Sequence, residues 1–261
     1  MKEYCAALTI AGSDPGGGAG IQADLKTFSA LGVFGTAVIT AVTAQNMAGV
    51  TAVEPITPGV VQKQLIAVLE EFPIKAVKTG MLYSAEIIGA IVEILSNYRL
   101  IPLILDPVLT STTGSKLLRD DALDTLVTGL FPLAALITPN IPEAEILTGL
   151  TGETMENMTL KLYERFRVPV LLKGGHRADK AEDVLMDDKG VERFNSQLIG
   201  EVKTHGSGCT LASAIAAAMA RGEPLRKAVG TAKAYMTETL RHAIQLTPGL
   251  RVINHFPAHF E

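Results

Sequence analysis

Short apolar runs alternate along the chain with longer segments whose apolar residues recur at helical spacing. The apolar runs have the length of buried strands and lie at residues 5–11, 34–44, 76–78, 102–105, 133–138 and 168–172. The longer segments predict helices at residues 21–31, 58–72, 86–98 and 120–130. Strands that alternate with helices form parallel sheets covered on both faces. The pattern therefore predicts an α/β fold with three αβα layers and a doubly wound, mostly parallel sheet.

The last third of the chain departs from this alternation. Residues 183–186 and 191–194 flank a polar turn that ends at Gly190, which predicts a hairpin and hence an antiparallel edge to the sheet. Two helices are predicted after the hairpin, at residues 207–221 and 224–245.

Composition and charge narrow the class of protein. Hydrophobic residues make up 48% of the chain and charged residues 19%, which is typical of a folded protein. The length of 261 residues, without a visible linker or repeat, predicts a single domain over residues 1–261. The formal net charge of −4 and the lack of a basic block argue against nucleic acid as a partner. Two cysteines without disulfide or metal spacing, and no apolar stretch of membrane-spanning length, favour a cytoplasmic protein with no membrane partner.

A glycine-rich turn opens the helix predicted at residues 207–221. Its sequence is Thr204-His205-Gly206-Ser207-Gly208-Cys209-Thr210. The first turn of a helix has unpaired N–H groups and a partial positive charge, and glycines let a ligand approach them, so the turn is a candidate phosphate cradle. A helix N-terminus also lowers the pKa of a thiol, which makes Cys209 a candidate base or nucleophile. An ordinary glycine turn with an inert, packed cysteine explains the same pattern equally well.

A second glycine-rich loop, from Gly12 to Gly20, lies between the first predicted strand and the first predicted helix. This is the arrangement of a ligand loop at the carboxyl edge of a parallel sheet. The loop lacks the lysine that closes a Walker motif, and Ile21 occupies the third glycine position of a dinucleotide fingerprint. The loop therefore favours a close backbone approach without specifying a cofactor.

Polar residues follow four other predicted strands. Gln45 carries an amide that suits an aminopyrimidine edge, and Asp106 is placed for metal or phosphate chemistry. Asn140 and Glu143 offer oxygens for a magnesium shell, and Lys173 is a candidate phosphate contact. Each also has a plainer explanation. Gln45 and Asp106 suit turns, Asn140 and Glu143 suit a helix cap, and a lysine at a strand end is often merely solvated.

Six motifs, taken in order along the chain, resemble the hydroxymethylpyrimidine kinases of the thiamin pathway. They are Ala11–Pro15 with Gly17–Thr27, Lys78–Leu82, Asp106–Val108, Ile137–Asn140, Leu172–His176 and Thr204–Thr210. Each motif is weak alone, but together they cover nearly the whole chain. The resemblance implies a ribokinase-like fold. It also implies MgATP-dependent phosphorylation of 4-amino-5-hydroxymethyl-2-methylpyrimidine, and then of its monophosphate to the diphosphate.

The resemblance further implies a role for each site residue. Gly206 and Gly208 would donate backbone N–H groups to the transferring phosphoryl group, and Cys209 would accept the proton of the substrate hydroxyl. The residues that would bind the pyrimidine are Gly12, Asp24, Gln45, Met81 and Val108. Those that would bind ATP are Asp106, Asn140, Lys173 and Ser207. Those that would hold magnesium and its waters are Asp106, Asn140 and Glu143.

The implied ligands are ATP, Mg²⁺ and a small pyrimidine, with a monovalent cation as a further candidate, and a homodimer is the expected assembly. Two positions depart from the family pattern. Ser207 stands where many relatives have threonine, a change that keeps the hydroxyl, and Thr43 stands where an apolar residue is more usual.

Three alternatives stay open. A pyridoxal kinase of the same branch shares the cysteine loop, although Gln45 at the second strand exit favours the pyrimidine. A cysteine hydrolase would pair Cys209 with His205, but a histidine four residues earlier in a glycine loop is poorly placed to face the thiol. A non-catalytic pyrimidine-binding protein would need neither the magnesium residues nor Lys173.

Overall fold

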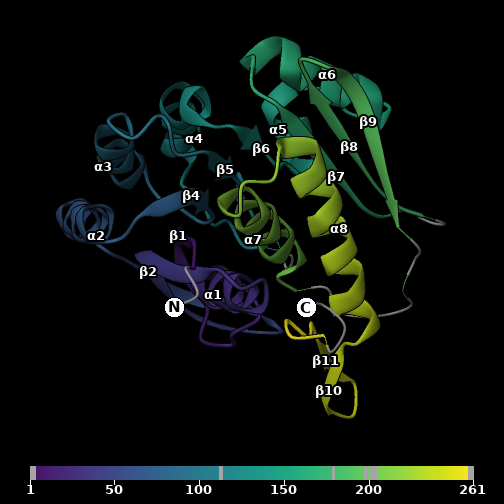
Figure 1. Cartoon of the computed structure of the whole chain (residues 1–261), viewed down its shortest axis with the longest axis horizontal. Coiled ribbons are helices and arrows are strands. Elements are labelled where there is room, and N and C mark those ends of the chain that lie inside the picture. Colours follow the sequence, from purple (N-terminus) through teal and green to yellow (C-terminus); the bar gives the residue numbers. More distant parts are fainter. Residues whose placement is uncertain (1–3, 112–113, 178–179, 197–198, 200–204, 258–261) are drawn as a thin grey trace.

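The computed structural model describes residues 4–111, 114–177, 180–196, 199 and 205–257. A nine-stranded sheet runs through it in the order β3-β2-β1-β4-β5-β6-β7-β8-β9 (Figure 1). The strands are β1 (Ala6–Ser13), β2 (Phe34–Asn46), β3 (Gly49–Pro55), β4 (Ile74–Thr79), β5 (Leu103–Leu105), β6 (Leu136–Ile137), β7 (Val170–Arg177), β8 (Lys180–Asp187) and β9 (Gly190–Ser196).

The direction of the strands confirms a mostly parallel α/β sheet. Strands β2, β1, β4, β5, β6 and β7 pair in parallel, as helical crossovers require. The hairpin β8–β9 pairs antiparallel to β7 and forms the predicted edge. The opposite edge is also antiparallel, because β2 turns back into β3, a strand that the sequence analysis did not predict.

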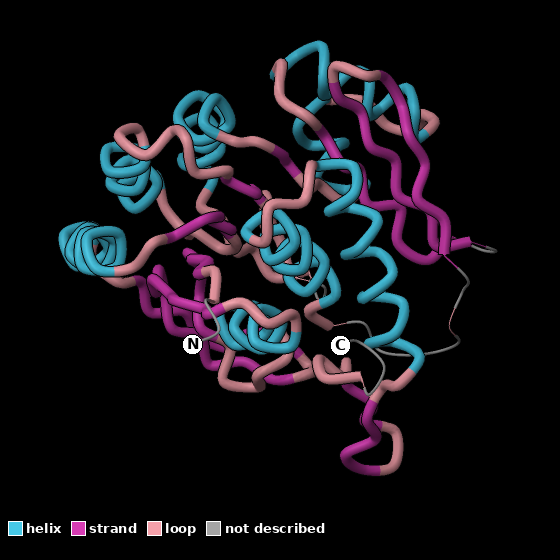
Figure 2. Tube along the Cα trace, viewed as in Figure 1, coloured by secondary structure: helices cyan, strands magenta, loops and turns pink. Residues whose placement is uncertain are grey.

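Helices cover both faces of the sheet (Figure 2). One face packs against α2 (Pro58–Glu71), α3 (Ala85–Leu95), α5 (Ile141–Thr148) and α6 (Met155–Phe166). The other packs against α1 (Gly20–Ala30), α7 (Ser207–Ala220) and α8 (Leu225–Arg241). Helix α7 is a run of small residues that lies against β1, β4 and β5, so its first turn reaches the carboxyl edge of the central strands.

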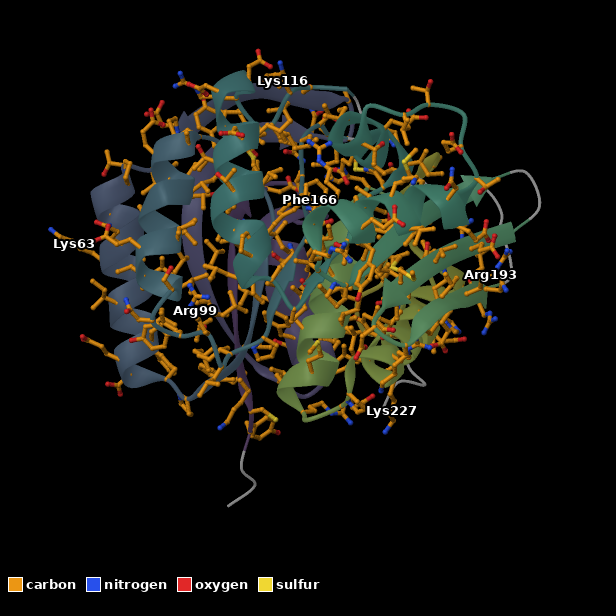
Figure 3. The ribbon with its side chains drawn as sticks, turned by 90° about the horizontal axis from the view of Figure 1, so that it is seen from above. Lys63, Arg99, Lys116, Phe166, Arg193 and Lys227 are labelled. Atoms are coloured by element: carbon orange, nitrogen blue, oxygen red, sulfur yellow. The ribbon has the colours of Figure 1, made fainter. Side chains whose placement is uncertain are left out.

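Burial separates an apolar interior from a charged surface. Nearly all of β1 is buried, as expected for a central strand covered on both faces. Charged side chains such as Lys63, Lys116 and Arg193 lie at the outside of the molecule (Figure 3). Among the described helices, none is both long and apolar enough to pass through a lipid bilayer.

Two predicted helices differ in the structure. Residues 120–130 form a 3₁₀ turn, one short α turn (α4, Leu123–Thr125) and a π turn, which end at a second 3₁₀ turn containing Pro132. Proline donates no backbone hydrogen bond, so a regular helix does not continue through it. Helix α8 ends at Arg241 because residues 244–252 form the hairpin β10 (Ile244–Thr247) and β11 (Leu250–Val252). The predicted helix, residues 224–245, therefore extended four residues too far, and the hairpin turns at Gly249, which has a φ of 82°.

Candidate active site

A cavity of about 280 Å³ lies at the carboxyl ends of the parallel strands, against the first turn of α7. Residues far apart in sequence meet there because neighbouring parallel strands deliver their exit loops to the same edge. Twelve of the thirteen predicted site residues lie on its wall: Gly12, Gln45, Met81, Asp106, Val108, Asn140, Glu143, Lys173, Gly206, Ser207, Gly208 and Cys209.

The turn that begins α7 is built around Gly206. This residue is the N-cap, with a φ of 84°, and a Cβ at this position would lie 1.7 Å from the carbonyl oxygen of Gly18. Only glycine fits there, so the two glycine-rich loops of the sequence pack directly on each other. The predicted helix start is thus confirmed, although Thr204, the first residue of the motif, lies outside the described residues.

Gly208 lies on the cavity wall beside two charged groups. A Cβ at this position would lie 3.2 Å from Lys173 Nζ and 3.7 Å from Asp106 Oδ2. The space next to the helix N-terminus is therefore flanked by an ammonium group and a carboxylate oxygen. This combination suits a phosphate together with its metal ion.

Lys173 and Asp106 form an ion pair within the cavity. Lys173 Nζ donates to Asp106 Oδ1 at 2.5 Å, and Thr138 Oγ1 donates to the same oxygen at 3.0 Å. Burial alone would lower the pKa of Lys173, but the carboxylates of Asp106 and Glu143 outweigh it and raise the pKa. Lys173 is therefore a fixed cation. Both hydrogen bonds that Asp106 receives from described side chains go to Oδ1, which leaves Oδ2 facing the space at Gly208.

Asn140 and Glu143 form a capping box at the start of α5. Asn140 Oδ1 accepts from the Glu143 N–H at 2.8 Å, and Glu143 Oε2 accepts from the Asn140 N–H at 2.8 Å. Burial raises the pKa of Glu143 to about 7, with Lys173 opposing that rise and Asp106 adding to it. The helix-capping explanation is correct for both residues, and both also face the cavity. Across the part of the chain that the structure describes, no group of three or more His, Cys, Asp or Glu side chains forms a metal cage.

Cys209 lies in the first turn of α7, on the wall of the cavity. The expectation of a lowered thiol pKa is wrong: burial raises it, and the carboxylates of Asp24 and Asp106 add to that rise. The ammonium group of Lys78 and a hydrogen bond from the Gly20 N–H act in the opposite direction without overcoming burial. The helix N-terminus is present as predicted, but desolvation is the larger effect.

Gln45 occupies the cavity wall at the end of β2, beside Asp14, which sequence analysis did not select, and His205, which it considered only as the partner of Cys209 in a hydrolase. Its Nε2 lies 3.0 Å from His205 Nε2, and the same histidine atom lies 3.2 Å from Asp14 Oδ2. An Nε2–H that donates to Asp14 leaves no acceptor for the amide, so the two hydrogen bonds belong to different tautomers. The Gln45 amide can therefore turn from His205 to a ligand while Asp14 keeps its partner.

Asp14 organises the first glycine-rich loop. Its carboxylate accepts from the backbone N–H groups of Gly16 at 2.8 Å, Gly18 at 3.1 Å and Ala19 at 2.8 Å. Burial opposes ionisation, but the hydrogen bonds from His205 and the loop hold the pKa of Asp14 below its ordinary value. The signal in the sequence was an aspartate at the start of a glycine run, a position where carboxylates commonly bind turn N–H groups.

Asp24 is the one predicted site residue that the cavity excludes. Its side chain is fully buried, and its oxygens accept from Lys78 Nζ, Thr9 Oγ1 and Ser213 Oγ. A carboxylate with all these partners has no oxygen left for a pyrimidine. The structure therefore places Asp24 in an internal ion pair and not in the substrate pocket.

The far end of the cavity is lined by α8 and the β8–β9 hairpin, which sequence analysis did not connect with the site. Lys233 Nζ donates to Asp183 Oδ2 at 2.6 Å, and Asp183 Oδ1 accepts from the Gly174 N–H at 3.1 Å. The two charged residues are 50 positions apart, and only the packing of α8 beside the hairpin brings them together. No short motif marks such a pair.

Comparison with known proteins decides the family. The model of the phosphomethylpyrimidine kinase family matches residues 14–254. The chain belongs to this family. The matched range takes in the first glycine-rich loop from Asp14 onward, the turn at Gly206–Gly208, and the cavity residues Gln45, Asp106, Asn140 and Lys173.

Relatives of the chain carry consistent names. A hydroxymethylpyrimidine/phosphomethylpyrimidine kinase of Rhizobium meliloti is 45% identical over 258 residues, which are 96% of each chain. The bifunctional thiamine biosynthesis protein ThiED of Geobacter sulfurreducens is 48% identical over 255 residues, and the match covers 96% of this chain but only 52% of that relative. The chain thus spans about half the length of the second protein.

A solved structure of the Bacillus subtilis pyridoxal kinase, as an ADP complex, superposes with a TM-score of 0.88. It is 31% identical in sequence, and the match covers 99% of this chain and 100% of that one. The agreement over the whole length confirms the ribokinase-like fold implied by the family motifs.

Proposed function

We propose that this protein is the kinase that uses MgATP to phosphorylate the hydroxymethyl group of 4-amino-5-hydroxymethyl-2-methylpyrimidine, and then phosphorylates the resulting monophosphate to the diphosphate for thiamin synthesis. The observation that carries the proposal is the space at Gly208. There the first turn of α7 faces Lys173 and Asp106 with Cys209 beside it. Phosphoryl transfer requires mainly positioning and charge neutralisation, and this arrangement supplies both.

Each wall of the space has a separate role in the proposed reaction. The N–H groups of the Gly206–Gly208 turn stabilise the charge that develops on the transferring phosphoryl oxygens. Lys173 is fixed as a cation by Asp106 and contacts an ATP phosphate. Cys209 accepts the proton of the substrate hydroxyl, whose oxygen attacks the γ-phosphorus. Ser207, on the same turn, adds a hydroxyl toward the nucleotide.

The acidic residues fit a magnesium ion carried in with ATP. Magnesium favours oxygen ligands and usually keeps several waters, so one or two carboxylates and the phosphates suffice. Asp106 Oδ2 faces the space at Gly208, and Glu143 and Asn140 lie on the same wall. These three residues would hold the ion and its waters, and the bound metal would neutralise phosphate charge. The monovalent cation remains a prediction of the same kind.

Product analysis tests the proposal directly. The purified protein is incubated with MgATP and either the pyrimidine alcohol or its monophosphate, and the products are identified by mass spectrometry. The proposal expects one added phosphoryl group in each reaction, with ADP formed in equal amount. ATP consumption without a phosphorylated pyrimidine from the alcohol would contradict it.

A pyridoxal kinase activity is the second candidate, because the fold superposes closely on the B. subtilis pyridoxal kinase. Sequence identity favours the pyrimidine, since the R. meliloti pyrimidine kinase is 45% identical and the pyridoxal kinase 31%. Gln45 on the cavity wall supplies the amide that pairs with an aminopyrimidine edge.

Gln45 gives the first mutational prediction. The Gln45→Ala variant is expected to bind the pyrimidine alcohol more weakly by about 1–3 kcal/mol, the cost of one lost hydrogen-bond partner in a buried site. ATP binding should change little. Calorimetric titration measures both, and Gln62→Ala on α2, a residue hydrogen-bonded to Glu93 outside the cavity, is the matched control. Unchanged affinity for the alcohol would remove Gln45 from the pocket.

Glu143 gives the second prediction. The Glu143→Gln variant keeps the size and much of the cap geometry but loses a charged oxygen near the metal position, so the magnesium concentration that supports half-maximal turnover should rise. Glu145→Gln, on the same helix α5 but off the cavity wall, should behave like wild type. If the magnesium dependence of Glu143→Gln equals that of wild type, Glu143 serves only as a helix cap.

A further inference from the structure

A buried ion pair lies behind the first turn of α7. Lys78, at the end of β4, is fully buried, and its Nζ lies 2.8 Å from both carboxylate oxygens of Asp24 on α1. Moving two charges out of water is costly, and a buried pair is often no more stabilising than apolar residues of similar size. Stability alone is therefore a weak explanation for its presence.

Asp24 is held in place from three elements. Thr9 Oγ1 on β1 donates to Oδ2 at 2.6 Å, and Ser213 Oγ on α7 donates to Oδ1 at 2.6 Å. Ser213 lies four residues after Cys209, so the two side chains share one face of α7. The carboxylate thus ties the helix that carries the thiol to β1, α1 and the ammonium group of Lys78.

The ammonium group lies directly beneath the cavity wall. A Cβ at Gly80 would lie only 3.0 Å from Lys78 Nζ, and Gly80 immediately precedes Met81 on that wall. The hydrogen-bond partners of Nζ within the described residues are the two oxygens of Asp24. The positive end of the pair is therefore fixed close to the site while it remains shielded from water.

The charged groups that face Cys209 come from four elements. Lys78 on β4 and Lys173 on β7 favour a negative sulfur, whereas Asp24 on α1 and Asp106 after β5 oppose it. The effect of Lys78 on the thiol pKa is larger than that of Asp24, so the cationic end of the pair dominates at the sulfur. The backbone N–H of Gly20, the first residue of α1, also donates to the sulfur, whereas the ring of His205 lies beside Asp14 and Gln45.

We propose that Lys78, held by Asp24, is a positioning residue that stabilises the thiolate form of Cys209, the form that accepts the proton of the substrate hydroxyl. This rests on the proposed function of Cys209 as the base. In the step, the proton moves from the hydroxyl to Cys209 Sγ, the hydroxyl oxygen bonds to the γ-phosphorus, and the bond from that phosphorus to the β–γ bridging oxygen of ATP breaks. Lys78 keeps all its protons throughout.

Two substitutions that act in opposite directions test the proposal. Lys78→Met removes the cation and should slow the alkylation of Cys209 by iodoacetamide about tenfold at pH 8 for each unit of rise in the thiol pKa. Asp24→Asn removes the negative charge that raises the pKa of Cys209, while it retains a polar group for Thr9 and Ser213. This variant should therefore be alkylated at Cys209 faster than wild type. Peptide mass spectrometry follows the reaction from pH 7 to 10, with alkylation of Cys5 in the same sample as the reference.

Two further variants separate this effect from damage to the fold. The double variant, Lys78→Met together with Asp24→Asn, leaves no unpaired buried charge, so its thermal stability should be closer to wild type than that of either single variant. Its Cys209 should still be alkylated more slowly than in wild type. Lys75→Met, at an exposed position of the same strand, should match wild type. Alkylation that slows in both single variants, or stays unchanged in Lys78→Met, would overturn the proposal.

Kinetics distinguish this proposal from the function on which it rests. In the double variant kcat should fall and its rise with pH should move to higher pH, while KM for the pyrimidine stays near the wild-type value. The alkylation measurement needs no substrate, so it detects failure of the Lys78 effect even in an active kinase. Full activity of Cys209→Ala would instead refute the base and, with it, the role of Lys78 in turnover.

Discussion

The Cys209→Ala variant is expected to lose about 10²–10⁴-fold in turnover, the usual contribution of a general base, while it still binds MgATP and the pyrimidine alcohol. Cys209 lies on the cavity wall in the first turn of α7, next to the position proposed for the phosphoryl group at Gly208. Because burial raises the thiol pKa, wild-type turnover should continue to rise with pH above the ordinary range of a cysteine, near pH 8.5. The alanine variant should lack that rise.

Further measurements separate a base from a covalent nucleophile. Cys209→Asp should recover part of the lost turnover, because a carboxylate can accept the same proton. The intact-protein mass of the wild type should not change during turnover, since the substrate hydroxyl and not the thiol attacks phosphorus. Cys5→Ala, which changes the other cysteine outside the cavity, is the control and should keep full activity. A stable phosphocysteine, or full activity in Cys209→Ala, would refute the assignment.

Gly208→Ala keeps its backbone N–H but should crowd the phosphoryl group away from the first turn of α7, and is expected to lower turnover by about 10²–10³-fold, the scale of losing one hydrogen bond to a developing charge. The added methyl group would lie 3.2 Å from Lys173 Nζ and 3.7 Å from Asp106 Oδ2, and so would enter the proposed phosphoryl position. Its nearest neighbour is the end of a flexible side chain, so the fold should tolerate it. The pyrimidine should bind nearly as well as in wild type, which direct titration measures.

Alanine substitutions at two other glycines are the controls for Gly208→Ala. Gly89→Ala on α3 has open space around the new methyl group and should leave turnover unchanged. Gly206→Ala places a Cβ 1.7 Å from the Gly18 carbonyl and should lower thermal stability as well as activity. If Gly208→Ala retains wild-type turnover, the phosphoryl group does not occupy the first turn of α7.

Much of the fold was predictable because it depends on local pattern. The buried strands β1, β2, β4 and β5 and the helices α1, α2 and α3 carry the expected periodicities and appear within a few residues of the predicted bounds. Strand β3 escaped prediction because it is an edge strand with much of its surface exposed, so burial imposes little pattern on it. The helix predicted at residues 120–130 is divided into three short turns, and Pro132 lies in the 3₁₀ turn that follows them; hydrophobic periodicity does not distinguish such turns from a regular helix.

The site was predictable where one residue sits at the end of one strand or helix. Asp106, Asn140 and Lys173 follow this rule, because a parallel sheet collects its strand exits at one edge. The rule fails where contacts decide the role. Asp24 looked like a pocket residue, but Lys78, 54 positions away, takes its carboxylate. The pKa of Cys209 was expected to be lowered by the helix N-terminus, but burial, which the sequence does not reveal, raises it. The single domain and the homodimer stay predictions.

The measurement that tests the central claim most directly is the ratio of kcat/KM for the pyrimidine alcohol to kcat/KM for pyridoxal, determined in one reaction mixture with limiting MgATP. Gln45, on the pocket wall, should select the aminopyrimidine edge, so the account predicts that phosphorylated pyrimidine forms first and that the ratio exceeds one. The same ratio in Gln45→Ala should fall. A wild-type ratio below one, with pyridoxal phosphorylated in preference, would contradict the account.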